Sequence, residues 1–145
     1  MDGGWQLPTE TRTIRQKIFL KAPPNEIFDA LIDPEKQSEF TGSVATGLGA
    51  VGSEFSAWDG YIKGRHLVLE RGKKIVQEWY TAEWPRGLPP SRLEIILEEK
   101  EGGTELSLEQ RGVPSDQAAL YEKGWVDFYW SPLEDYLMRG QRSRG

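Results

Sequence analysis

The chain contains few of the side chains that usually carry catalysis or bind metal ions. It has no Cys, and His66 is its only imidazole. A chain without Cys has no disulfides, thiolate zinc sites or Cys nucleophiles, and a single His excludes sites that need two imidazoles. We therefore expect no cofactor and no metal ion, and the sequence predicts a protein that is not an enzyme.

His66 and the carboxylates are the remaining candidates for acid–base chemistry. His66 falls in a predicted strand, where a lone His is most often a surface residue or a core residue with satisfied hydrogen bonds. Carboxylates such as Glu98 and Glu99 fall in turns or at outward-facing positions, whereas catalysis by paired carboxylates needs two of them held together with pKa values pushed apart. Burial of His66 or of a carboxylate in a cavity would favour an enzyme.

Charge and hydropathy argue against two kinds of partner. The 145 residues carry 18 Lys and Arg against 23 Asp and Glu, a net charge of −5. We expect no nucleic-acid partner, because that binding depends on clustered basic side chains. No apolar run approaches the ~20 residues of a membrane-spanning helix, so we expect no membrane insertion. Residues 1–5 lack the basic and apolar regions of a signal peptide, which predicts a cytoplasmic protein.

The N-terminal part of the chain is predicted to form one strand and two short helices. Residues 11–20 alternate in part between apolar and charged side chains, which is typical of a half-buried strand. Pro24 and Glu26 suit the first turn of a helix. Asp33-Pro34 separates this helix from a second one that ends near Phe40, and a Gly-rich loop follows.

The middle of the chain is predicted to form a run of about five strands. Asp59-Gly60 and Gly102-Gly103 are turn sequences, and the former is typical of a tight two-residue hairpin. Apolar and polar residues alternate on either side of Gly102, which indicates strands with one buried and one solvent-exposed face. Such strands form antiparallel sheets.

A long C-terminal helix is predicted from about Ser115 to Met138, because its aromatic and aliphatic residues recur at spacings of three and four. Pro132 lies inside this helix and is expected to kink it. Gly124 costs about 1 kcal/mol relative to Ala in a helix interior. We therefore expect close packing at Gly124.

Together these elements predict an α+β fold in which a curved antiparallel sheet of about six strands wraps round the C-terminal helix. The predicted domain spans residues 11–138. It follows an N-terminal extension at residues 1–10 and precedes a flexible basic tail at residues 139–145.

Several segments carry a resemblance to a known family. Residues 21–31 look like the start of START-like helix-grip domains. The other segments, in their order and spacing, resemble the C-terminal domain of activators of the heat-shock protein 90 ATPase; they are Ser53-Glu54-Phe55 before Asp59-Gly60, residues 75–80 with Trp84-Pro85, residues 111–114 and residues 124–130. The resemblance extends over nearly the whole chain, from about Thr11 to Met138.

The resemblance implies a passive binding function. Helix-grip domains often enclose an apolar cavity between the sheet and the long helix, and many bind lipids, sterols or other hydrophobic molecules there. The sequence supplies six Trp, five Tyr and five Phe. We expect a small hydrophobic ligand in a cavity lined by Phe28, Leu31, Phe40, Phe55, Trp79, Trp125, Phe128, Tyr129 and Leu133. The alternative is that these side chains fill the core.

The resemblance also implies two other functions. One is a co-chaperone module that binds a heat-shock protein 90 chaperone and modulates its ATPase, with Trp84 and Pro85 as interface residues because Trp is favoured at interfaces. Packing of Trp84 over the sheet edge is the alternative. In two-domain activators an N-terminal domain makes the main chaperone contact; about ten residues precede the first strand here, so we expect weak or no chaperone binding. The third function, least favoured, is an enzyme acting on a polyketide-like or aromatic substrate.

Overall fold

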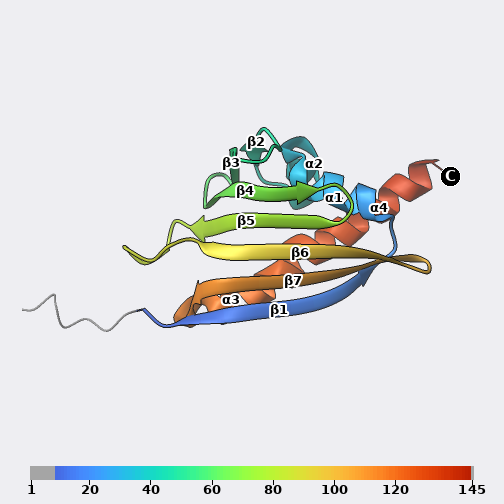
Figure 1. Cartoon of the computed structure of the whole chain (residues 1–145). Helices are drawn as coiled ribbons and strands as arrows, with labels where there is room; N and C mark the ends of the chain where they lie inside the picture. The colour runs from blue at the N-terminus through green and yellow to red at the C-terminus, as the bar shows by residue number, and fades with distance from the viewer. Residues whose placement is uncertain (1–8, 145) are drawn as a thin grey trace, which may run out of the picture.

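Over residues 9–144, the part of the chain that the computed structural model describes, seven strands form one antiparallel sheet and a long C-terminal helix lies across one face of it (Figure 1). The order across the sheet is β1-β7-β6-β5-β4-β3-β2. The strands are β1 (Thr11–Leu20), β2 (Thr46–Gly47), β3 (Glu54–Ala57), β4 (Ile62–Glu70), β5 (Lys74–Thr81), β6 (Ser91–Lys100) and β7 (Gly103–Pro114). The predicted α+β helix-grip fold is confirmed.

Two short helices follow β1, as predicted. They are α1 (Pro24–Ile32) and α2 (Pro34–Thr41). Asp33 caps the N-terminus of α2, where its carboxylate accepts a hydrogen bond from the amide of Glu35 at 2.9 Å. Gly42 ends the helix in the left-handed conformation, with φ 78°. Figure 1 shows both helices behind β4, beside the C-terminal helix.

The sheet contains one strand more than the predicted number. β2 lies in the segment that was expected to be a loop, and it pairs with β3 through Thr46–Ser56 and Gly47–Phe55. The hydroxyls of Thr46 and Ser56 are 2.7 Å apart, so a side-chain hydrogen bond adds to this short pairing. A two-residue strand has no periodicity, which is why no alternation marks it in the sequence.

The turn between β3 and β4 differs from the predicted two-residue hairpin. Ala57 pairs with Ile62, so four residues form the loop. Trp58 and Asp59 both adopt left-handed backbone conformations, with φ 54° and 57°. Asp59 is held by Val44: its amide donates to the Val44 carbonyl at 3.0 Å, and its carboxylate accepts from the Val44 amide at 3.1 Å.

The C-terminal helix has three parts, α3 (Ser115–Gly124), the π-helical segment η2 (Trp125–Trp130) and α4 (Ser131–Arg144). In η2 the Ser131 amide donates to the carbonyl of Val126, five residues earlier. The irregularity expected at Pro132 thus takes the form of a π-helical segment that ends just before it, since Pro has no N–H and its ring displaces the preceding turn. The helix also continues past its predicted end at Met138.

The boundaries of the predicted domain fall near the ends of the described chain. The predicted N-terminal extension, residues 1–10, lies mostly outside the described residues. The predicted tail, residues 139–145, is helical in backbone to Arg144, and Gly145 lies outside the described residues. Its flexibility stays a prediction.

The core lies between the inner face of the sheet and the C-terminal helix. A buried hydrogen-bond network joins the two: the Gln110 amide donates to Ser91 Oγ at 3.0 Å, and its carbonyl accepts from Trp125 Nε1 at 2.9 Å. Gln110 is fully buried, with 0% of its surface exposed. Because both ends of its amide are bonded, it fixes the position of Trp125 without leaving an unsatisfied polar atom.

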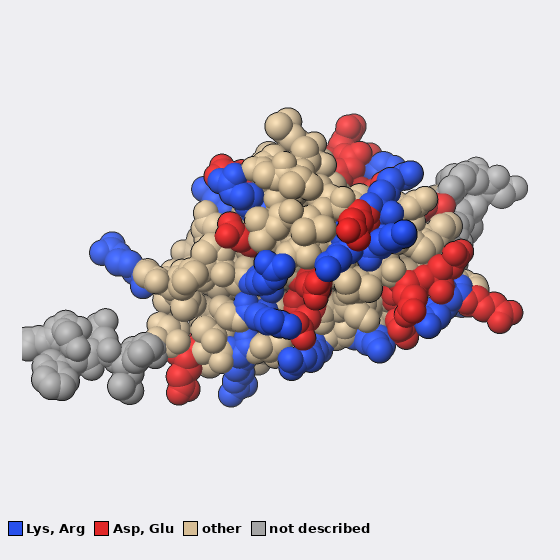
Figure 2. Space-filling model, in the orientation of Figure 1, with Lys and Arg blue, Asp and Glu red and all other residues tan. Residues whose placement is uncertain are grey.

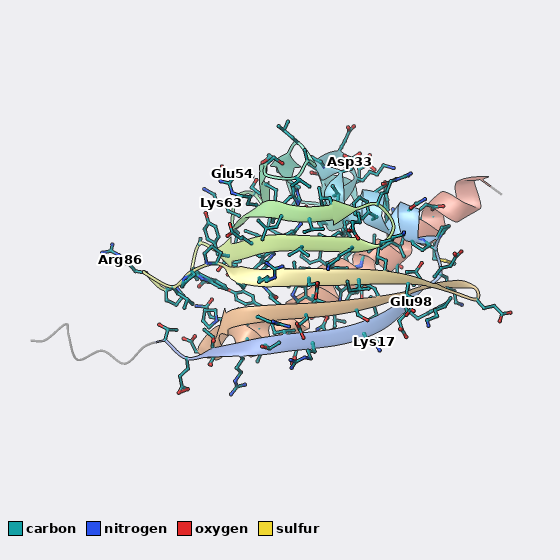
Figure 3. The ribbon with its side chains drawn as sticks, in the orientation of Figure 1. Lys17, Asp33, Glu54, Lys63, Arg86 and Glu98 are labelled. Atoms are coloured by element: carbon teal, nitrogen blue, oxygen red, sulfur yellow. The ribbon has the colours of Figure 1, made fainter. Side chains whose placement is uncertain are left out.

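The outer face of the sheet carries charged side chains of both signs (Figure 2). Many are paired across strands, as in Arg15–Glu109 at 3.1 Å and Lys74–Glu94 at 3.3 Å. Figure 3 shows Lys17 and Glu98 pointing outward from the ribbon. Exposed pairs contribute at most about 1 kcal/mol each. Within residues 9–144, none of the helices combines the length and the hydropathy of a membrane-spanning segment.

Candidate functional site

An aromatic groove opens between the C-terminal helix and the β3–β5 part of the sheet. Its volume is about 340 Å³, and the described residues that line it are Trp58, Tyr61, Ile62, Trp79, Leu120, Tyr121, Gly124, Trp125, Phe128 and Tyr129. None of these residues is charged. Ligand pockets usually measure about 300–1,000 Å³. The groove can therefore accommodate a small apolar molecule.

The rim of the groove leaves apolar surface in contact with solvent. Leu120 is 62% exposed and Phe128 is 55% exposed, and both lie on the C-terminal helix beside the groove. A contiguous apolar patch of this kind is typical of binding sites rather than of an ordinary protein surface.

Two of the tyrosines that line the groove, Tyr61 and Tyr121, have hydrogen-bonded hydroxyls. Tyr121 Oη lies 2.7 Å from Thr81 Oγ1 and also donates to Gln117 Oε1, and Tyr61 Oη donates to Glu83 Oε1. Burial and the hydrogen bond to Glu83 raise the pKa of Tyr61, so its phenol stays neutral. With these hydroxyls bonded to other side chains of the protein, the groove presents mainly apolar ring surface.

Trp58 reaches the groove from a strained backbone. Its ring packs edge-on against Phe128 and Tyr129, with centroid separations of 5.5 and 6.2 Å. A left-handed backbone conformation costs a residue with a bulky side chain about 1–2 kcal/mol. Such strain persists only where the surroundings impose it, and it clusters at functional sites.

Gly124 is on the groove wall and is not closely packed, so the prediction of close packing there is wrong. The nearest atom to a Cβ built at this position is Phe128 Cδ2, at 3.7 Å, which is an ordinary contact. Since packing does not require Gly here, its effect is to widen the groove between α3 and the sheet.

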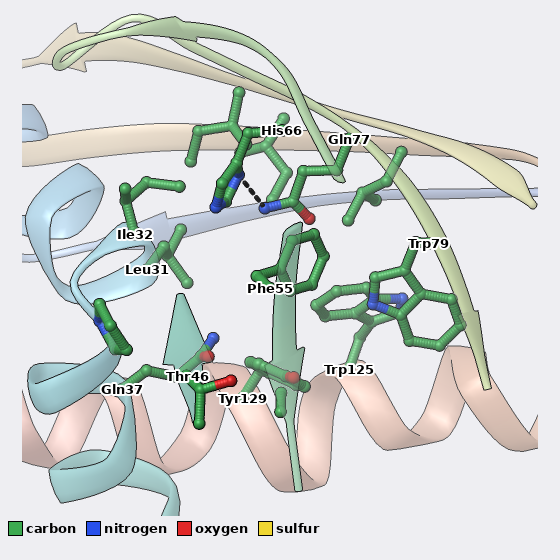
Figure 4. Close-up of a pocket in the computed structure, with 15 residues that line it drawn as sticks. Leu31, Ile32, Gln37, Thr46, Phe55, His66, Gln77, Trp79, Trp125 and Tyr129 are labelled. Atoms are coloured by element: carbon green, nitrogen blue, oxygen red, sulfur yellow. Dashed lines mark hydrogen bonds between the residues drawn. The ribbon is translucent and has the colours of Figure 1, made fainter. Parts of the chain in front are cut away.

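A second, much smaller cavity lies deeper, between the sheet and the helices (Figure 4). Its volume is about 30 Å³, enough for a water molecule but not for a ligand. It shares Trp79, Trp125 and Tyr129 with the groove, so these three rings form the partition between the two spaces. We call this space the inner cavity.

His66 and Gln77 are two buried polar side chains in the wall of the inner cavity. His66 is 3% exposed and Gln77 is 8% exposed, and Gln77 Nε2 lies 3.3 Å from His66 Nδ1. Figure 4 shows the two side chains pointing toward each other. The Phe55 ring stacks on His66 with centroids 4.8 Å apart. Burial lowers the pKa of His66, which favours the neutral imidazole.

The residues predicted to line a ligand cavity divide into three sets. Those that line the groove are Trp79, Trp125, Phe128 and Tyr129. Leu31 and Phe55 line the inner cavity. Phe28, Phe40 and Leu133 are buried in the core and line neither space.

The two spaces also include residues outside the predicted set. On the C-terminal helix, Leu120, Tyr121 and Gly124 share one helix face with the predicted Phe128, and this periodicity is a signal that identifies them. Trp58, His66 and Gln77 have no comparable signal, because a four-residue loop and a strand register bring them to the site.

The other predicted contact region, Trp84 and Pro85, packs back against the protein. Trp84 Nε1 donates to the carbonyl of Pro89 at 2.9 Å, and its ring stacks on Tyr121 with centroids 6.3 Å apart. Both residues are half-buried. They line a surface hollow of about 560 Å³ together with Tyr80 and other residues.

The site offers little acid–base chemistry. His66 is buried in a cavity, as an enzyme would require, but the described residues that line this cavity include no Asp, Glu, Lys or Arg. His66 therefore has no charged partner there for proton transfer. No group of Asp, Glu and His within residues 9–144 could hold a metal ion.

Comparisons with known proteins point to one family. Residues 21–138 match the family described as "Activator of Hsp90 ATPase homolog 1-like protein". The human activator of 90 kDa heat shock protein ATPase homolog 1 is 29% identical over 139 residues, which is 96% of this chain and 40% of the human protein. The Dictyostelium discoideum homolog is 29% identical over 79% of this chain and 30% of its own length. The chain thus spans less than half the length of these curated relatives.

Solved structures show the same fold in small proteins. A protein from Mesorhizobium loti has a TM-score of 0.74 and 27% identity, with 88% of this chain and 98% of that chain covered. An HSP90 activator from Plasmodium falciparum also has a TM-score of 0.74, with 24% identity over 88% of this chain and 95% of that chain.

Proposed function

Since the chain belongs to the activator of Hsp90 ATPase homolog 1-like family, and its helix-grip domain has an aromatic groove, we propose that it binds a small hydrophobic molecule in that groove without transforming it. The observation that carries this proposal is the 340 Å³ volume with an uncharged lining. An apolar ligand that covers Phe128 and Leu120 removes their exposed surface from water, which contributes about 25 cal/mol per Å².

The geometry supports a ligand with an aromatic ring. Trp58, Trp125 and Phe128 lie around the groove, and the paired rings meet at tilted or edge-on angles. Aromatic rings prefer edge-to-face or offset contacts, each contributing about 0.5–1.5 kcal/mol beyond area burial. A planar apolar ligand can make several such contacts at once, whereas a flexible alkyl chain cannot.

The test is a titration with N-phenyl-1-naphthylamine, an uncharged aromatic fluorophore whose emission rises in apolar surroundings. We expect saturable binding at one site. Gly124→Leu fills the groove wall and is expected to weaken binding by at least about tenfold. Ala119→Leu adds the same side chain at an exposed position of α3 outside the groove lining, so it is the matched control and should bind as the wild type does.

Two results would contradict the proposal. One is a fluorescence rise that does not saturate, because a defined groove has a limited capacity. The other is equal affinity of the Gly124→Leu and Ala119→Leu variants, which would place the fluorophore elsewhere on the protein.

A second candidate function is a co-chaperone module, favoured by the similarity to the human activator over 96% of this chain. The surface hollow beside Trp84 and Pro85 is the contact region that we propose for a chaperone of the heat-shock protein 90 type. A cytoplasmic location, expected from the sequence, suits this function and stays a prediction.

The co-chaperone function is tested with the purified chaperone from the same organism. Stimulation of its ATPase by the chain, with loss of stimulation in Pro85→Glu, is the expected result. Phe128→Ser, which changes the groove rim on the C-terminal helix, should leave the stimulation unchanged. No change in ATPase rate at saturating concentrations of the chain would reject this function.

A further inference from the structure

The inner cavity contains two buried polar atoms that no residue in the described part of the chain satisfies. The Gln77 amide nitrogen faces His66 Nδ1, so the neutral ring carries its proton on Nε2 when that amide donates. Gln77 Oε1 and His66 Nε2 have no hydrogen-bond partner among the described residues, and both side chains are more than nine-tenths buried. An unpaired buried polar atom costs about 1–3 kcal/mol, so a bound group that pairs with these atoms gains stability.

Gln110 provides a contrast to these unpaired atoms. Gln110 is equally buried, yet its amide donates to Ser91 and its carbonyl accepts from Trp125. The inner cavity has room for a water molecule beside His66 and Gln77, whereas Gln110 is enclosed by its partners. The polar pair therefore faces a space that a ligand group can take over.

The lining of the inner cavity restricts the chemistry of that group. Its described residues carry no charged side chain, so a carboxylate or an ammonium group would be buried without a counter-ion, at a high cost in free energy. A neutral His66 offers a donor at Nε2, and Gln77 offers an acceptor at Oε1. A hydroxyl group can accept a hydrogen bond from His66 Nε2 or donate one to Gln77 Oε1. It needs no more space than the water molecule that it replaces.

The partition between the groove and the inner cavity lies partly on the π-helical segment. Trp125 and Tyr129 belong to η2, and Trp79 faces them from β5, with the Trp79 and Trp125 centroids 5.9 Å apart. Hydrogen bonds in π-helical turns are less regular than in α-helices, and such turns occur frequently at functional sites. A ligand that occupies both spaces requires a shift of these rings.

We propose that His66 and Gln77 form a polar subsite that binds the hydroxyl group of an otherwise hydrophobic, uncharged aromatic ligand whose body occupies the groove. This inference rests on the proposed function, and it specifies the class of ligand. The hydroxyl displaces a water molecule from the inner cavity and bonds to the polar pair. Ligands of the same shape without a hydroxyl occupy the groove and leave the subsite to water.

The experiment compares 2-naphthol with 2-methylnaphthalene, which have the same shape and differ in one polar group. We expect the wild type to bind 2-naphthol about tenfold more tightly, as one or two well-formed hydrogen bonds allow. Gln77→Met and His66→Phe should bring the two affinities to within about twofold of each other. Binding of 2-methylnaphthalene to the same variants is the control, because a merely structural effect would weaken both probes equally.

A second measurement on the wild type does not depend on whether the variants fold. With ¹⁵N-labelled His, 2-naphthol should shift the Nε2 resonance of His66, the single His of the chain, and 2-methylnaphthalene should leave it unchanged. Saturable binding of both probes with equal affinity and no Nε2 shift would overturn the subsite and leave the proposed function standing. Failure of both probes to bind would overturn the proposed function, and the subsite with it.

Discussion

At the scale of single residues, the environment of His66 in the structure differs most from the one predicted from the sequence. Its type and its place in a strand were predicted, but a strand of partly apolar residues does not show which of its faces is covered. Register decides this: His66 pairs with Gln77 on β5, and both side chains point into the inner cavity. The pairing joins residues on separate strands, so no local pattern in the sequence reveals it.

The burial of His66 makes the stability of the protein depend on pH. Its pKa is lowered in the folded state by burial, while in the unfolded chain it is about 6.5. As pH falls below about 6.5, the unfolded state takes up a proton that the folded state does not bind, so the free energy of unfolding decreases. His66→Phe should remove this dependence between about pH 6.5 and 5.

Urea denaturation at several pH values checks this prediction. Asp29 and Glu109 also have lowered pKa values, because of the hydrogen bonds from Arg71 and Arg111 respectively. Their stabilising effect is present above the unfolded values near pH 4 and is lost below them, so the window above about pH 5 isolates His66. An identical pH dependence in the wild type and His66→Phe would contradict the burial of a neutral imidazole.

At the scale of elements, the periodic segments were predicted well and the irregular ones were not. The strands on either side of Gly102 and the face of the C-terminal helix carry clear periodicity, and the structure confirms both. The π-helical segment and β2 have no periodicity of their own. They arise because Pro132 disturbs the preceding helical turn and because β3 offers an edge to pair with.

Replacement by Ala of two glycines in regular elements, Gly64 and Gly124, should have opposite effects on the stability of the protein. At Gly64 on β4, a Cβ would clash with the Glu78 carbonyl oxygen and would lie 2.6 Å from Phe55 Cζ. Because neither strand can shift without breaking the ladder, Gly64→Ala should destabilise the protein by about 2 kcal/mol. Gly124→Ala meets only an ordinary contact and should stabilise it by about 0.5–1 kcal/mol.

The midpoints of urea denaturation of these two variants provide the measurement, and each variant serves as the control for the other. If Gly64→Ala were as stable as the wild type, the close approach of β4, β5 and the Phe55 ring would be wrong. A loss of stability in Gly124→Ala would mean that packing at this helix position is tighter than the 3.7 Å contact with Phe128 indicates.

At the scale of the whole molecule, the fold was predictable, but the shape of the space between the sheet and the C-terminal helix was not. The aromatic residues of the C-terminal helix indicated an interface with the sheet. Whether such rings leave a cavity depends on their volumes and rotamers together. Trp79, Trp125 and Tyr129 line both spaces, of which the inner cavity has about 30 Å³ and the open groove about 340 Å³.

The central claim is that this groove is a ligand site, and intermolecular NOEs test it most directly. In the wild-type protein saturated with N-phenyl-1-naphthylamine, we predict NOEs from the fluorophore to the rings of Trp58, Trp125 and Phe128, which line the groove from both sides. NOEs confined to other surfaces, such as the hollow beside Trp84, or no NOEs under saturating conditions, would contradict the claim.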